Sequence, residues 1–149
     1  MVSIEPAASE DIPQLVELLS ALFTQETDFR PDPAKHARGL RLIIEQAQVG
    51  RIFVARERGD IVGMVNLLFT VSTAEGGLVV LLEDLVVRPG HRDKGTGSAL
   101  LRHAIDFAGA NGFARITLLT DRVNEQAMRF YARHGFQLSA MVPMRLVLQ

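Results

Sequence analysis

The segment His91-Arg92-Asp93-Lys94-Gly95-Thr96-Gly97-Ser98 organises this chain. An apolar, strand-like run over residues 78–87 precedes it, and an amphipathic, helix-like run over residues 99–108 follows it. Gly95 and Gly97 have no Cβ, so the backbone there can adopt positive φ and approach a ligand closely. The first N–H groups of a helix lack intrahelical acceptors and carry the positive end of the helix dipole. A basic, glycine-rich turn between a strand and a helix therefore predicts a site for phosphate or diphosphate.

The turn does not match two common phosphate-binding motifs. The chain has no G-x-x-x-x-G-K-[ST] segment, and Leu100 stands where a dinucleotide-binding fingerprint needs its third glycine. A tight turn that simply requires small residues is the structural alternative. Arg92 and Lys94 add charge-assisted donors for an anion.

Two motifs in order give the turn a family context. The first is Arg-x-x-Gly-x-Gly, from Arg92 to Gly97, preceded by Leu-Glu-Asp-Leu-Val-Val-Arg-Pro, from Leu82 to Pro89. The second is Asn-Glu-x-Ala-x-x-Phe-Tyr-x-x-x-Gly-Phe, from Asn124 to Phe136. Together they resemble the acetyl-CoA-binding motif and the following motif of the GNAT superfamily of N-acetyltransferases. The resemblance covers residues 78–136 by motif and residues 4–66 by pattern.

Composition limits the class of protein. With 149 residues, 48% of them hydrophobic, the chain is long enough for one compact domain over residues 1–149. A net charge of −1 gives no argument for nucleic acid or an anionic membrane as a partner. No segment approaches the roughly 18 apolar residues of a membrane span, and the N-terminus lacks the regions of a signal peptide. The absence of cysteine excludes disulfides, thiolate metal sites and a cysteine nucleophile, and it favours the cytoplasm.

Hydrophobic periodicity predicts an α+β fold. We expect helices over residues 9–23, 34–48, 99–108 and 124–134. We expect strands over residues 2–5, 51–57, 61–73, 78–87, 115–119, 136–142 and 144–148. The resemblance implies a mixed sheet with helices on both faces, splayed between the strand that ends at Val87 and the strand over 115–119. The apolar C-terminal strand pair also predicts a homodimer.

The resemblance implies that acetyl-CoA is the cosubstrate and that the turn holds its diphosphate. The backbone near the end of the central strand would pair with the pantetheine amides, and the N–H of Val86 or Val87 would donate to the thioester carbonyl. Asp93 is a departure, because many family members have glycine there and a carboxylate beside a diphosphate is unfavourable unless it faces solvent or pairs with a cation. The expected cofactor contacts are Leu85, Val86, Val87, Arg92, Asp93, Lys94, Gly95, Thr96, Gly97, Ser98 and Asn124.

Tyr131, the only tyrosine of the chain, is implied by the resemblance to be the general acid that protonates the departing thiolate. Asn124 lies seven residues earlier, about two helical turns, so both side chains belong to one face of a helix. Asn124 is also the expected helix cap. The alternative for Tyr131 is a half-buried core residue.

Glu83 and Asp84 interrupt the apolar run, where an unpaired charge is costly. Because adjacent strand residues face opposite sides, only one is expected in a reactive cleft, unless a bulge relaxes the alternation. We expect Glu83 to share a face with Leu81 and Leu85 and to accept the proton of the amine, directly or through water. Asp84 would share a face with Leu82 and Val86 as a structural, electrostatic or substrate-binding partner. Alternatively, Glu83 is a rim carboxylate paired with Arg88.

The acceptor is less defined than the cofactor. The run that contains Glu83 and Asp84, with the second motif, is similar to the diamine and thialysine acetyltransferase branch, which implies a small cationic amine. Glu26 and Asp28 would lie at the substrate mouth of that fold. A protein N-terminus or lysine, an amino acid or an aminoglycoside-like drug stay open as acceptors, as does a non-catalytic module that binds acetyl-CoA or CoA. The four histidines lack metal-ligand spacing, so no metal is expected.

Overall fold

The computed structural model describes residues 2–25 and 30–149. The chain forms two compact units, residues 1–119 and 120–149. The elements of the larger unit, in chain order, are β1 (Ser3–Pro6), the 3₁₀ turn η1 (Ser9–Asp11), α1 (Ile12–Gln25), α2 (Pro33–Ile44), β2 (Gly50–Glu57), β3 (Asp60–Ser72), β4 (Gly77–Val87), α3 (Thr96–Ala110) and β5 (Ile116–Leu118). The smaller unit contains α4 (Glu125–Arg133). The single domain expected over residues 1–149 stays a prediction.

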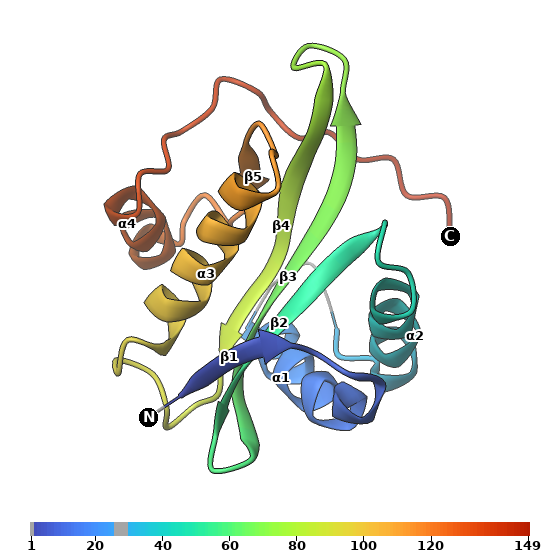
Figure 1. Cartoon of the computed structure of the whole chain (residues 1–149), viewed down its shortest axis with the longest axis vertical. Helices are drawn as coiled ribbons and strands as arrows, with labels where there is room; N and C mark the ends of the chain where they lie inside the picture. Colours follow the sequence, from blue (N-terminus) through green and yellow to red (C-terminus); the bar gives the residue numbers. More distant parts are fainter. Residues whose placement is uncertain (1, 26–29) are drawn as a thin grey trace. The chain divides into compact units, whose positions relative to one another are not determined.

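The sheet of the larger unit is mixed and follows the chain, in the order β1-β2-β3-β4-β5. Its first four strands are antiparallel neighbours, and β5 runs parallel to β4. A parallel neighbour requires a crossover, which α3 provides. Figure 1 shows the long β3–β4 hairpin, with α3 running alongside β4. The predicted α+β architecture is confirmed.

Helices cover both faces of this sheet. Under α1 and α2 lies a buried apolar cluster of Ile12, Leu15, Leu18, Leu19, Leu40, Ile52, Val54, Ile61, Met64 and Val86. Phe53 and Gly63 are strand neighbours of cluster members, so they face the opposite side. There the Phe53 ring packs edge-on against His103 of α3, with ring centroids 4.5 Å apart. We call the two sides the α1/α2 face and the α3 face.

The sheet opens between β4 and β5, as the sequence predicts. Only Val80 to Leu82 of β4 pair with β5, opposite Ile116 to Leu118. β4 continues to Val87, still paired with β3 on its other side. Within the larger unit, residues 83–87 therefore present an unpaired backbone edge toward the gap.

A β-bulge at Glu83 changes the faces along β4. Asp84 lies opposite Asn66, and the next pair is Leu82 with Leu67, so Glu83 has no cross-strand partner. Because Asn66 and Leu67 are neighbours on β3, Asp84 and Leu82 lie on opposite faces. The expectation that Asp84 shares a face with Leu82 is therefore wrong, because one extra residue reverses the alternation.

A partly buried ion-pair network fastens the N-terminal segment to β2. The buried carboxylate of Asp11 accepts hydrogen bonds from the N–H of Ala8 (2.8 Å) and from Nη2 of Arg56 (2.6 Å). Arg56 also pairs through Nε with Glu5 of β1. The hydrogen bond to Asp11 is the main cause that raises the pKa of Arg56 above its ordinary value. The network thus joins β1, the turn before α1 and β2.

The boundary between α2 and β2 differs from the prediction. The helix predicted to end at Gln48 ends at Ile44, and Gly50, predicted to stop it, is the first residue of β2. A Cβ at Gly50 would lie 2.3 Å from the carbonyl oxygen of Leu67. Gly50 is therefore required for the close approach of β2 to β3 rather than for a helix end.

The C-terminal strands predicted over residues 136–142 and 144–148 are wrong. Gly135 has φ = 94° and follows α4 as expected, but residues after it form no strand in the described chain. Apolar alternation predicts a strand, yet a strand forms only where a neighbour accepts its backbone hydrogen bonds. The predicted homodimer was based on a C-terminal strand edge, and that edge is not formed in the described chain.

The contact at Gly63 yields a test of the fold. A Cβ there would lie 2.9 Å from Leu100 Cδ1 and 3.2 Å from the Val86 carbonyl oxygen, and Leu100 is fully buried. We expect Gly63→Ala to lower the free energy of unfolding by about 1–3 kcal/mol through overpacking. Gly109→Ala is the control, because a Cβ at that exposed helical position would meet nothing within 4 Å apart from its own stretch of helix. It should raise the free energy of unfolding by about 0.5–1 kcal/mol. Urea denaturation measures both, and a Gly63→Ala protein as stable as the wild type would contradict the packing argument.

Candidate active site

The glycine turn places free backbone donors at the N-terminus of α3. Gly95 is the N-cap and has φ = 84°, a left-handed conformation that favours glycine. Gly97 instead lies inside the first helical turn. The first intrahelical bond of this end runs from the N–H of Ala99 to the carbonyl of Gly95 (2.9 Å). The N–H groups of residues 96–98 thus precede the helical ladder and are available to an anion.

The start of α3 is held against the sheet. Thr96 is buried, although it is the first helical residue, and Leu100 one turn later is fully buried. Both side chains approach Gly63 on β3, which pairs with Val87 at the end of β4. Because Gly63 has no side chain, the N-terminus of α3 lies directly beside the end of β4. We call this N-terminus, with the free N–H groups of residues 96–98, the cradle.

The two cationic side chains of the turn differ in their contacts. Arg92 folds back, and its Nε donates to the carbonyl oxygen of Val87 (3.2 Å). Lys94 is exposed. The turn is also tied by the N–H of His91, which donates to the carbonyl of Arg88 (2.9 Å), and the His91 ring lies 3.8 Å from the carboxylate of Glu57. Arg92 thus joins the turn to the strand end whose backbone faces the gap.

Asp93 adopts φ = 63°, in the left-handed region. Glycine adopts this conformation without steric cost, whereas other residues are strained there, Asp and Asn least. The departure from glycine noted in the sequence therefore falls on a position whose backbone favours glycine. Asp93 is exposed, so its carboxylate can face solvent.

The two adjacent carboxylates differ in burial. Asp84 is 8% exposed and accepts a hydrogen bond from Nδ2 of Asn66 (3.0 Å), whereas Glu83 is exposed. Asn66 also lies opposite Ile52, so Asp84 belongs to the α1/α2 face. The register places Leu81 on this face too, opposite Leu68, and ordinary alternation from Leu81 keeps Glu83 there. The bulge therefore lets both carboxylates turn to one face, with only Glu83 open to a solute.

Asn66 adds an acceptor to this face. Its amide oxygen is buried and, among the residues that the structure describes, has no hydrogen-bond partner. Buried oxygens of this kind normally accept a hydrogen bond from water or a ligand. The acidic end of the site thus offers the exposed carboxylate of Glu83 to a cationic solute, above the buried amide oxygen of Asn66.

Arg88 does not pair with Glu83, which removes the partner assumed by the rim alternative. Its Nη1 lies 3.3 Å from the carboxylate of Glu17 on α1, and its Nε donates to the carbonyl of Ile61 (3.0 Å). The N–H of Ile61 in turn donates to Gln14 of α1 (3.0 Å). These contacts tie α1 to the strand ends next to the glycine turn.

The smaller unit carries the remaining predicted residues. Asn124 caps α4 as expected, because its Oδ1 accepts from the N–H of Ala127 (3.0 Å). The Tyr131 ring packs edge-on against Phe130 and Phe136, with ring centroids 5.2 and 5.6 Å apart. The structure therefore brings residues 83–98 together in one unit and describes Asn124 and Tyr131 in the other. Glu26 and Asp28 lie outside the described residues.

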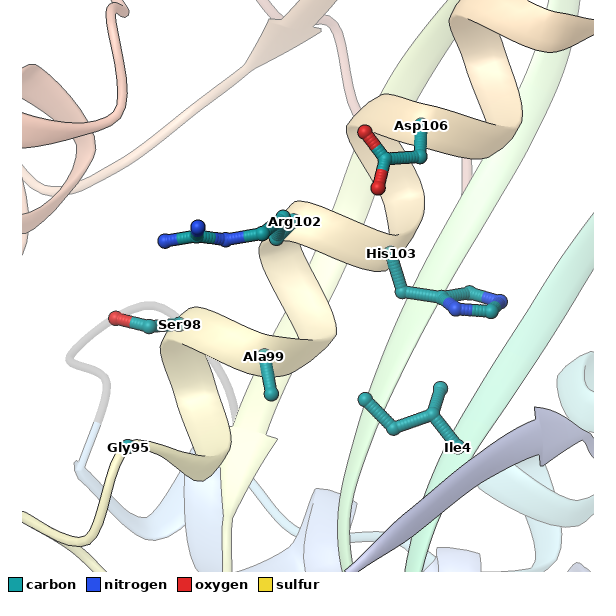
Figure 2. A pocket seen from close by; sticks show the side chains of 7 residues that line it. All are labelled: Ile4, Gly95, Ser98, Ala99, Arg102, His103 and Asp106. Carbon is teal, nitrogen blue, oxygen red and sulfur yellow. The ribbon is translucent and has the colours of Figure 1, made fainter.

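A pocket of about 390 Å³ adjoins the cradle on α3 (Figure 2). Its lining residues are Ile4, Gly95, Ser98, Ala99, Arg102, His103 and Asp106. Arg102, His103 and Asp106 lie outside both sequence motifs and were not predicted as site residues. The four-residue spacing of Ser98, Arg102 and Asp106 on one helix side was the signal that could have found Arg102 and Asp106.

Other features of the described chain limit the chemistry. Within residues 2–25 and 30–149, no three His, Asp or Glu side chains gather so as to hold a metal ion. None of the described helices combines the length and the apolar composition that a membrane span requires.

The model of the acetyltransferase (GNAT) family matches residues 12–136. The chain belongs to the GNAT acetyltransferase family. This match includes the cradle, the bulge with both carboxylates, and Tyr131. The family prediction and the predicted acyltransferase class are confirmed at the level of the family, whose members use acetyl-CoA as cosubstrate.

Relatives support the same family. The chain is 37% identical over 86 residues to an uncharacterized N-acetyltransferase, YhfO, of Bacillus subtilis, a match that covers 58% of each protein. It is 40% identical over 87 residues to streptothricin acetyltransferase of Streptomyces lavendulae, covering 58% of this chain and 44% of that protein. The chain thus spans about half the length of the curated relatives it matches. An integron cassette protein from the mobile metagenome of Cole Harbour Salt Marsh has a TM-score of 0.85 at 27% identity, covering 98% of this chain and 90% of that chain.

The backbone at Asp93 generates a test that needs no ligand. We expect Asp93→Gly to be more stable than Asp93→Ala by about 1 kcal/mol, because glycine accepts φ = 63° whereas alanine brings a Cβ without the local hydrogen bonding of an aspartate. The comparison of two variants removes the effect of the lost charge. The midpoints of urea unfolding measure the difference, and an Asp93→Ala protein as stable as Asp93→Gly would show that the turn relaxes to negative φ.

Proposed function

We propose that this chain is an acetyl-CoA-dependent N-acetyltransferase that acetylates a primary amine by direct attack in a ternary complex. The observation that carries the proposal is the juxtaposition of the N-terminus of α3 with the open edge of β4. One supplies N–H donors for a diphosphate, and the other supplies an extended backbone for the amides of pantetheine. Family membership supports both assignments.

The backbone of residues 83–87, beside the gap, can donate a hydrogen bond to the thioester carbonyl. In an antiparallel pair, alternate residues direct their N–H and C=O groups away from the partner strand. Residues 83–87 pair with β3 alone, so these groups point to the side on which the sheet opens. An N–H of Val86 or Val87 there donates to the carbonyl oxygen, which becomes anionic as the amine attacks.

The amine must be neutral before it attacks. A lysine-like ammonium has a pKa of about 10.4, so supplying the neutral amine at pH 7 costs about 4–5 kcal/mol. Glu83 is the proposed proton acceptor, directly or through water, and Asp84 the buried electrostatic partner. The amine nitrogen then forms its bond to the carbonyl carbon, the carbon–sulfur bond breaks, and Tyr131 donates its proton to the thiolate of CoA. The proton that the nitrogen loses as the amide forms passes through water and restores the Tyr131 hydroxyl. The absence of cysteine excludes an acyl-enzyme through a thiol.

A small cationic amine is the proposed acceptor, as in the diamine and thialysine branch. Support comes from the exposed Glu83 beside Asp84 and the unfilled acceptor on Asn66, with Glu26 and Asp28 as further acids. The match to a streptothricin acetyltransferase makes a drug amine a second acceptor class. A protein N-terminus or lysine is the alternative acceptor, and a non-catalytic CoA-binding module is the alternative function.

The homodimer and the cytoplasmic location stay predictions. Exposed apolar side chains after α4, among them Leu138, Met141 and Met144, support the first. The absence of cysteine supports the second.

A negative charge introduced at the cradle tests whether CoA binds there. We expect Gly97→Glu to abolish binding of CoA, because a side chain and a negative charge enter the first turn of α3 where the diphosphate binds. Gly109→Glu is the matched control, with the same charge change near the other end of the helix, in open space. Isothermal titration calorimetry measures both affinities. Undiminished CoA affinity in Gly97→Glu would overturn the placement.

The chemical roles are tested by two isosteric changes. Tyr131→Phe keeps the ring but removes the proton donor, so we expect kcat to fall about 10²–10³-fold with little change in acetyl-CoA affinity. Glu83→Gln should act mainly on the acidic limb of the kcat/KM profile, where a base must be ionised. Thiol release from acetyl-CoA with a panel of primary amines measures both. Normal turnover of both variants would leave positioning by residues 85–87 as the source of the rate, whereas CoA binding without turnover of any amine would favour the non-catalytic module.

A further inference from the structure

The pocket on α3 continues the cradle along the helix, away from the gap between β4 and β5. It begins at Gly95 and Ser98, which belong to the proposed diphosphate site, and extends past Arg102 to Asp106. Its lining also includes Ile4 of β1, which Figure 2 shows near Ala99 and His103, on the other side of α3 from Ser98 and Arg102. A diphosphate held at residues 94–98 carries pantetheine on one side. The group attached on its other side would therefore lie next to this pocket.

Arg102 is the one cation of that pocket lining. It is exposed, it follows Ser98 by one helical turn of about 5.4 Å, and Figure 2 shows both side chains extending from the same side of α3. Among the residues that the structure describes, none forms a hydrogen bond or ion pair with Arg102. Asp106, one turn further on in the same described helix, is likewise not paired with it. The guanidinium thus keeps its five donors for a second anion near the first.

The chemistry of CoA supplies such an anion. Its diphosphate leaves the ribose at C5′, and a separate phosphate is attached at C3′ of the same ring. The two anionic groups are thus separated by little more than a sugar ring, comparable to one turn of the helix. Ser98 is too short and too weak a donor to neutralise the second phosphate, whereas a guanidinium binds phosphate with two parallel hydrogen bonds.

The rest of the lining fits the uncharged part of a nucleotide. Asp106 would repel a phosphate, so the phosphate belongs at the Ser98–Arg102 end. The carboxylate of Asp106 and the imidazole of His103 accept or donate hydrogen bonds to neutral hydroxyl and amino groups. Ile4 and Ala99 add apolar contact.

We propose that Arg102 binds the 3′-phosphate of CoA and that this pocket holds the nucleotide end of the cosubstrate. Arg102 thereby determines specificity for CoA over nucleotide thioesters without that phosphate. This inference rests on the proposed function, because it takes the diphosphate to lie at residues 94–98. It adds a residue outside both sequence motifs.

The experiment compares CoA with 3′-dephospho-CoA, which differ only by the phosphate in question. Isothermal titration calorimetry at 0.15 M salt gives both dissociation constants for the full chain, and their ratio reports the recognition of the 3′-phosphate. The wild-type protein should prefer CoA by about 10- to 100-fold, the range of a charge-assisted hydrogen bond. Arg102→Ala should bring this ratio close to one by weakening CoA alone. Arg102→Lys, which keeps the charge but loses the fork, should give an intermediate ratio.

The matched control is Arg41→Ala. Arg41 is an exposed arginine near the end of α2, which packs on the other face of the sheet, and its loss changes the net charge by the same amount. Its CoA to dephospho-CoA ratio should equal that of the wild type. A change equal to that of Arg102→Ala would mean that long-range charge, not a contact, sets the ratio, and would overturn the proposal.

The remaining outcomes separate this inference from the proposed function. Tight binding of both ligands by the wild type without preference would overturn the role of Arg102 and leave the diphosphate cradle intact. Equal weakening of both ligands by Arg102→Ala would also overturn it, because the residue would then support the diphosphate or the helix. Failure of the wild type to bind either ligand would overturn the proposed function as well.

Discussion

The close contact between the first turn of α3 and β3 is the constraint on which the site depends. Gly63 has no side chain, so Leu100 and Thr96 pack directly against the strand. That contact fixes the N-terminus of α3 beside the end of β4, because Gly63 pairs with Val87. The helix dipole and its free N–H groups therefore lie next to an extended strand edge, which places an anion site and a peptide-like site side by side.

The open edge of β4 has two structural causes. β5 pairs with only Val80 to Leu82 of β4. The backbone of β4 after Leu82 therefore has no strand neighbour on that side within the larger unit. The bulge at Glu83 lies where this pairing stops, and it turns Glu83 and Asp84 to the α1/α2 face. A regular strand would have separated the two carboxylates onto opposite faces. A bulge of one residue thus places two acidic residues next to the open edge of β4.

Charge is divided along the site in a way that suits the proposed reaction. Lys94, Arg92 and Arg102 gather around the start of α3, and the acids lie upstream on β4. An anionic nucleotide is attracted to the first region and an ammonium to the second, so the two reactants would bind without competing for one surface. Arg88, which lies between them in the sequence, is engaged by Glu17 and by the backbone carbonyl of Ile61.

Features that depend on neighbouring residues in the chain could be predicted without a structure. Glycines and polar caps indicated the turn at Gly95 and the start of α4 at Asn124, because backbone conformation and capping are local. The motifs around Arg92 and Tyr131 indicated the family, because each motif is a short run of neighbouring residues that can be read from the sequence. Features that depend on distant partners became visible only in the folded chain: the position of the bulge, the pairing of Asp84 with Asn66, and the contact of Arg88 with Glu17. The fold also overturned the strands predicted after Gly135, since alternation of apolar residues cannot supply the neighbouring backbone that a strand requires.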